Sequence, residues 1–127
     1  MSDFIVSSGL RAAQLAATQA FADSGSGNSY IVIYDTSENA LATLILSKPC
    51  GTVTAGVLRL HQQLPGGDLI AASGVATHAS WFAGNGTLVA QGDVTDEAGI
   101  GPFILGGAAG TQLYAGGRAI LGVTEIT

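Results

Sequence analysis

Charged side chains are scarce in this chain of 127 residues, which has four Lys and Arg and nine Asp and Glu. They make up 10% of the chain, whereas a typical soluble domain has about 25%. The net charge is −5, and the basic residues are scattered at Arg11, Lys48, Arg59 and Arg118. Binding to a nucleic-acid backbone needs clustered basic side chains, so we expect no nucleic-acid partner.

Cysteine and histidine are equally rare, with one Cys and two His. Cys50 is alone, which excludes an internal disulfide and fits folding in a reducing cytoplasm. His61 and His78 lack the short paired spacing of a structural zinc site. There is no phosphate-binding loop, dinucleotide fingerprint or nucleophile elbow. We therefore expect no enzyme, no metal and no cofactor, although a triad recognisable only by geometry leaves a cryptic active site open.

Long apolar runs are also missing. The N-terminus lacks the basic region and apolar stretch of a signal peptide. The most apolar uncharged segment, 98–110, is too short and too rich in glycine to span a bilayer. We therefore expect a soluble protein, made in the cytoplasm without export and without a membrane partner.

The abundant residues are glycine, with 19 copies, and aliphatic side chains. A monomer usually stays soluble through a charged surface, so such a neutral surface suggests that other subunits cover much of it. Alternatively, Ser, Thr, Asn and Gln solvate the surface. The length fits a single domain over 1–127, with an N-terminal arm (1–7), a helix (8–23) and a β-domain (30–127).

The helix is predicted from apolar spacing. Residues that recur three and four positions apart share one helical face, namely Leu10, Ala13, Ala17 and Phe21. Ser7 or Ser8 suits the N-cap, and Gly25 suits a stop after the helix.

Strands are predicted for most of the remainder. Tyr30–Tyr34 and 40–47 form a candidate hairpin whose apolar runs indicate burial on both faces, and Pro49 should end its second strand. A weaker strand covers 57–60, and one or two strands kinked near Gly74 cover 69–82.

The C-terminal part should also be β-structure. Asn85-Gly86 suits the positive φ angles of a primed turn, so 81–89 reads as a hairpin whose return strand reaches Val94. A glycine-rich loop, 96–110, includes a short strand at 103–105, and 119–126 alternates as one last strand. One helix followed by seven or eight strands predicts a mainly β fold, a β-sandwich or jelly-roll-like domain with one N-terminal helix.

Interface residues are suggested by apolar character outside the predicted core. Phe4, Ile5 and Val6 precede the helix, where they form either an arm that reaches a neighbouring subunit or a segment folded back on its own sheet. Adjacent strand residues point to opposite faces, so one member of the Trp81–Phe82 pair should anchor the core and the other either faces a partner or is a second core aromatic at a sheet edge. The full set of interface candidates is Phe4, Ile5, Val6, Trp81, Phe82, Asn85 and Tyr114.

The chain resembles small structural proteins of tailed-phage virions. The resemblance is carried by the Ala-rich helix and a series of strand sequences, at 9–22, Tyr30–Tyr34, 41–47, 79–82, 89–94 and 115–119. It implies a capsid decoration, or cement, protein: a non-enzymatic homo-oligomer, with a trimer favoured, that binds the major capsid protein on the outer surface of the virion and stabilises the shell.

Two other functions stay open. A tail, neck or baseplate component would share this composition and would form rings on the tail axis rather than threefold clusters on a shell. A glycan-binding β-sandwich module would need a polar-aromatic or Ca²⁺ site, for which Asp93, Asp96, Glu97 and Trp81 are the candidates. The three carboxylates lack the alternating pattern of a Ca²⁺ loop, so they read more simply as a solvated turn.

Overall fold

The computed structural model describes residues 7–64, 66–99, 101–106 and 110–126. The arm residues Phe4, Ile5 and Val6 lie outside these ranges. Helix α1 (Ser8–Ala22) is followed by strands β1 (Tyr30–Tyr34), β2 (Ala40–Thr54), β3 (Val57–Gln62), β4 (Asp68–Leu69), β5 (Gly74–Val75), β6 (His78–Phe82), β7 (Leu88–Asp96), β8 (Phe103–Gly106), β9 (Gln112–Leu113), β10 (Arg118–Leu121) and β11 (Glu125–Ile126).

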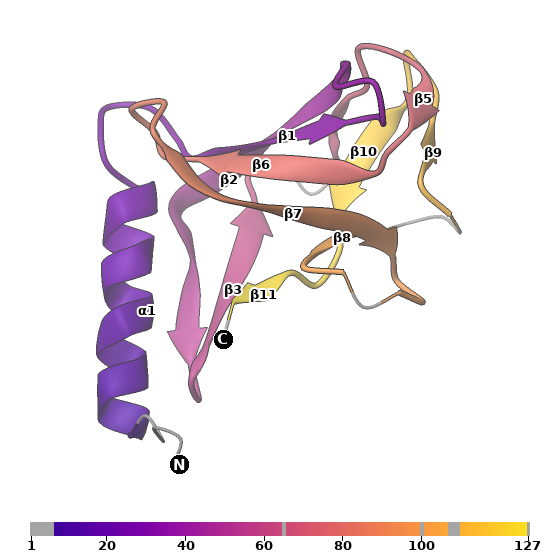
Figure 1. Ribbon diagram of the computed structural model, residues 1–127. Coiled ribbons are helices and arrows are strands. Elements are labelled where there is room, and N and C mark those ends of the chain that lie inside the picture. Colours follow the sequence, from indigo (N-terminus) through magenta and orange to yellow (C-terminus); the bar gives the residue numbers. More distant parts are fainter. Residues whose placement is uncertain (1–6, 65, 100, 107–109, 127) are drawn as a thin grey trace.

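Nine of these strands form one curled sheet, in the order β11-β3-β2-β1-β6-β7-β8-β10-β4 (Figure 1). The pairs are antiparallel except for β7 with β8. The sheet curls until its end returns to β2, where Ala42 and Ile70 form a bridge and the Asp68 carboxylate accepts the Ile45 N–H at 3.0 Å. The predicted mainly β, sandwich-like fold with one N-terminal helix is confirmed.

The buried hydrophobic side chains of the described residues form one core, which is mostly aliphatic and includes Trp81 and Phe103. In β1 the side chains of Ile31 and Ile33 are buried, whereas the residues on either side are only partly buried. The prediction that β1 is buried on both faces is therefore wrong, because Tyr30, Val32 and Tyr34 on its other face stay partly exposed. Strand alternation instead places one face on the core and leaves the other half-buried.

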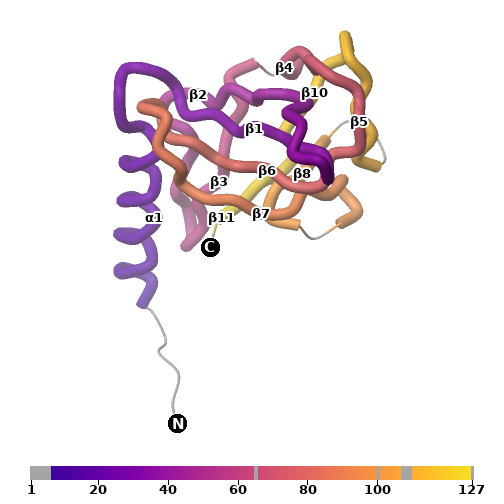
Figure 2. The backbone as a smooth tube through the Cα atoms, turned by 45° about the horizontal axis from the view of Figure 1, so that its top comes forward, coloured from indigo at the N-terminus to yellow at the C-terminus, as the bar shows by residue number. Residues whose placement is uncertain are grey.

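Helix α1 begins and ends close to the predicted positions. The Ser7 hydroxyl caps it by accepting the Leu10 N–H at 3.2 Å, and Asp23 is the C-cap. The helix lies beside the projecting β2–β3 hairpin, at the outer side of the molecule (Figures 1 and 2). Its buried residues are Leu15 and Ala22, and Gln19 donates to the Gly51 carbonyl at 2.6 Å.

The face predicted from apolar spacing is the exposed face of the helix. Leu10 and Phe21 are 50% and 48% exposed, and Ala13 and Ala17 are also exposed. An amphipathic helix normally turns its apolar face to the core. Here Leu15 and Ala22, on the opposite side, make that contact.

Strand β2 does not end at Pro49. It continues to Thr54, with a register shift between Leu46 and Gly51 that contains the proline. A proline has no N–H for the ladder and is tolerated at such an irregularity. Because β2 is long, its first half pairs with β1 and its second half with β3.

The predicted last strand, 119–126, is two strands. β10 pairs with β8 and β4, whereas β11 pairs with β3 at the far end of the strand order. Between them the Gly122 N–H donates to the Ile104 carbonyl, and the buried Thr124 accepts the Leu60 N–H. Alternation alone gives no sign of this break, because the sequence stays in phase across it.

The hairpin between β6 and β7 is present, but its turn is not a primed turn. Among its residues only Gly86 has a positive φ, of 88°. The Gly86 N–H donates to the Ala83 carbonyl, and the Ala83 N–H donates to the Thr87 carbonyl. This pattern is that of a three-residue loop with one glycine in the left-handed region.

Candidate interaction surfaces

A row of aromatic side chains lies on the outer side of β1 and β6. The alternate residues of these strands turn into the core, as Ile31, Ala79 and Trp81 do. The register opposes Tyr30 to Phe82, Val32 to Ser80 and Tyr34 to His78. We call these six half-buried residues the aromatic face: Tyr30, Val32, Tyr34, His78, Ser80 and Phe82.

The rings of this face stack in pairs across the two strands. The ring centroids of Tyr30 and Phe82 are 5.3 Å apart, and those of Tyr34 and His78 are 5.4 Å apart. Cross-strand aromatic pairs stabilise a sheet by about 0.2–1 kcal/mol each. One face of each ring packs against the neighbouring ring. The ring edges and faces that stay open to a partner form an ordered apolar ridge.

The strands on either side of the aromatic face place few charges beside it. Its neighbours in β2 are Ala40, Thr43 and Ile45, and those in β7 are Leu88, Gln91 and Asp93. Asp93 is the one charged residue in that set. An apolar aromatic centre within a mostly uncharged polar rim is the usual composition of a protein–protein interface.

His78 joins this face to the turn after β1. Its Nδ1 atom lies 2.8 Å from the Thr77 hydroxyl, and its Nε2 atom lies 2.9 Å from a Glu38 carboxylate oxygen. The contact with Glu38 has ion-pair distance but not the angles of a good hydrogen bond. Glu38 reaches the ring from a left-handed conformation, with φ of 64°.

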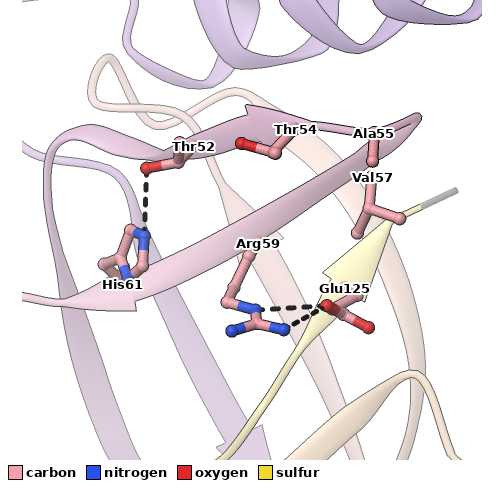
Figure 3. Close-up of a pocket in the computed structure, with 7 residues that line it drawn as sticks. All are labelled: Thr52, Thr54, Ala55, Val57, Arg59, His61 and Glu125. Carbon is pink, nitrogen blue, oxygen red and sulfur yellow. Dashed lines mark hydrogen bonds and ion pairs between the residues drawn. The ribbon is translucent and has the colours of Figure 1, made fainter.

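A second surface is an open groove of about 530 Å³ on the outer side of the β2–β3 hairpin (Figure 3). Arg59 donates to Glu125 of β11 through Nε at 3.1 Å and Nη2 at 2.7 Å. The Thr52 hydroxyl and His61 Nε2 are 3.1 Å apart. The groove is lined by Thr52, Thr54, Ala55, Val57, Arg59, His61 and Glu125.

The groove brings a hydroxyl beside an imidazole, at Thr52 and His61. A hydroxyl beside an imidazole can act as nucleophile and base when a third group orients the imidazole. In the described part of the chain, no carboxylate is hydrogen-bonded to His61. The Arg59–Glu125 pair is solvent-exposed, and such pairs contribute about 0–1 kcal/mol to stability.

The predicted interface residues are not one patch. Trp81 is 1% exposed and belongs to the core, so it is removed from the interface set. Phe82 lies on the aromatic face, which agrees with the expectation that the pair divides between core and surface. Asn85 is exposed in the β6–β7 turn, where its side-chain oxygen accepts the Thr87 N–H. Tyr114, at 68% exposed, follows β9 on a different part of the molecule.

Within the acidic cluster, Asp96 accepts hydrogen bonds from the loops that follow β7 and β8. The Asp96 carboxylate accepts the N–H groups of Gly110 and Ala98 at 2.7 and 3.1 Å. The bond from the Gly110 N–H is the main cause that lowers the pKa of Asp96. No group of three His, Cys, Asp or Glu in the described residues could hold a metal ion. Trp81 is buried in the core, so it cannot form a glycan-binding site together with the acidic residues Asp93, Asp96 and Glu97.

Cys50 has a structural environment. Its side chain is fully buried, and burial raises the pKa of its thiol to about 12. Its backbone N–H donates to the Asp23 carboxylate at 3.0 Å, which ties the end of α1 to β2.

The sequence did not lead us to expect Tyr30 and Tyr34 at the surface. The sequence of Tyr30–Tyr34 does contain a signal for this face. Alternate residues of a strand share a face, so the two tyrosines at its ends lie on the same side as its middle residue. Which residues oppose them in β6 depends on a pairing across more than forty positions.

Comparison of the chain with protein-family models, with curated proteins and with solved structures finds no match. Among the described residues, no helix is long and apolar enough to cross a membrane.

Proposed function

We propose that this protein is a non-enzymatic structural subunit of a tailed-phage virion, of the capsid decoration type, and that its aromatic face binds the shell. The observation that carries the proposal is the two pairs of stacked rings on an outer sheet face, where the bordering residues of β2 and β7 include one charge, Asp93, and Glu38 contacts His78 from the turn after β1. Stacking already restricts the rotamers of these rings. Binding a partner therefore costs less side-chain entropy at this face.

The position on the particle comes from the family resemblance alone. It favours the outer head, the major capsid protein as partner and threefold clusters of the chain. A tail, neck or baseplate position remains the alternative, and the low charge suits both. A glycan-binding role has no specific support, because Trp81 is buried and the stacked rings leave no broad aromatic platform.

The test is add-back to particles of the phage that encodes the chain, from which its gene has been deleted. We expect the purified protein to co-sediment with heads until it reaches a fixed ratio to the major capsid protein. We expect Phe82→Ser and Tyr34→Ser to weaken this binding and Leu64→Ser to leave it unchanged, since Leu64 is an exposed loop residue elsewhere.

Electron microscopy of the saturated particles locates the protein. Density in clusters on the head supports the decoration proposal, and a ring on the tail axis assigns the protein to the tail instead. Binding unaffected by both aromatic substitutions overturns the role of the aromatic face. The absence of the protein from wild-type particles overturns the virion proposal as a whole.

A further inference from the structure

The exposed side of helix α1 has no charged residue. Ten residues of the helix are exposed, namely Ser8, Gly9, Leu10, Ala12, Ala13, Gln14, Ala16, Ala17, Ala20 and Phe21. Arg11, the one charged residue of the helix, is partly buried and lies beside Gly56 of the hairpin. The solvent side of a surface helix normally carries charged and polar side chains. An exposed apolar stripe instead marks an interaction surface.

We infer that this stripe, formed by Leu10, Ala13, Ala17 and Phe21, is a self-association surface on which the helices of two copies pair antiparallel. Leu10 and Phe21 are eleven positions apart, so they lie about 16 Å apart along the axis, near the two ends of the helix. The alanines between them leave the backbone open to close approach, and packed helices lie about 8–10 Å apart.

The order of side-chain sizes along the stripe favours a second copy as the occupant. The midpoint between Leu10 and Phe21 falls between Leu15 and Ala16. A twofold axis there places Leu10 of each copy opposite Phe21 of the other and Gln14 opposite Ala17. Leu10 and Phe21 then oppose each other at both ends, and near the axis the small Ala17 leaves room for the longer Gln14 of the other copy, which is the self-complementarity that a twofold interface needs.

Direction and access agree with this pairing. Antiparallel helices place the positive end of each dipole beside the negative end of the other. Figures 1 and 2 show α1 at the outer side of the molecule, with the sheet on its other side, so the stripe is open to a second helix. A helix of 15 residues offers less than the ~800 Å² per partner of a standard interface, so we expect a reversible, concentration-dependent dimer.

Light scattering over a concentration series of the isolated chain tests the pairing. We expect the mass to rise with concentration from 12.6 kDa toward twice that value. Leu10→Glu and Phe21→Glu should each weaken association by about tenfold or more, because each places charges in the apolar contact. Leu64→Glu, at an equally exposed leucine outside the helix, is the matched control. Circular dichroism checks that each variant is folded.

Disulfide capture tests the direction. We expect an equimolar mixture of Leu10→Cys and Phe21→Cys chains to form a mixed disulfide dimer, and neither variant to form one alone. The native Cys50 is buried and should not interfere. A dimer of Leu10→Cys alone overturns the antiparallel arrangement. A wild-type chain that stays monomeric at every concentration, or a trimer insensitive to both Glu substitutions, overturns the inference. None of these outcomes depends on the virion proposal.

Discussion

The indole N–H of Trp81 donates to the hydroxyl of Ser29 at 2.6 Å inside the core, where the two residues are 1% and 0% exposed. The same hydroxyl donates to the Phe82 carbonyl at 2.6 Å. One small polar side chain therefore satisfies the polar atom of the largest core residue and links the connector after α1 to β6.

Ser29→Ala should destabilise the protein, because it leaves the indole N–H without its partner. An orphaned buried group costs about 1–3 kcal/mol. The measurement is urea unfolding followed by tryptophan fluorescence. Ser80→Ala, on the outer face of β6, should change the free energy of unfolding by no more than about 0.5 kcal/mol. Equal effects of the two substitutions would contradict this account of the core.

Ala55→Asn should stabilise the β2–β3 hairpin. Ala55 and Gly56 have φ of 53° and 80°, so both central residues of the turn are left-handed. Such turns favour Asn-Gly, and the left-handed conformation costs an ordinary L-residue about 1–2 kcal/mol. We expect thermal unfolding to show a gain of about 0.5–1 kcal/mol. Ala40→Asn, at an exposed strand residue without a positive φ, should give no gain.

Cys50 should resist thiol reagents in the folded protein. The nucleophile is the thiolate, and burial raises the thiol pKa from 9.0 to about 12, so the folded protein keeps the thiol protonated at neutral pH. Rapid labelling in urea and slow labelling in buffer are expected. The stability linked to this shift is complete below pH 9 and is lost as pH rises through about 12. Fast labelling of the native chain would show that the site opens readily.

Asp96→Asn should lower stability at neutral pH, because the N–H groups of Gly110 and Ala98 favour the ionised carboxylate and lower its pKa. A lowered folded-state pKa gives stability that is present above the unfolded value and lost as pH falls through the folded value. The variant and the wild type should therefore converge in acid. Unfolding measured across that range checks this. Asp93→Asn removes an equal charge at an exposed residue whose carboxylate has no hydrogen-bond partner in the described residues, and is the control.

The sequence was a reliable guide to local structure. Alanine content, spacing and a serine cap locate α1, and β-branched and aromatic runs locate β1 and the β6–β7 hairpin. These features depend on periodicity and on capping chemistry within a few residues. The scarcity of charge is likewise a property of the sequence.

The candidate surfaces were less predictable. Alternation assigns Trp81 and Phe82 to opposite faces without deciding which one is buried. The cross-strand ring pairs need the register of β1 with β6, and the groove needs β11 beside β3. These are pairings between distant parts of the chain, and no local pattern encodes them.

The sequence by itself determined the secondary structure type, the single core and the lack of charge. Tertiary structure alone decided that the final strand divides at 122–124, that β2 continues past Pro49 and that α1 packs through Leu15 and Ala22. The physical reason is that an apolar pattern indicates which residues share a face of a helix or strand. Which face is buried depends on contacts with distant parts of the chain, because the packing that removes more apolar surface from water is favoured.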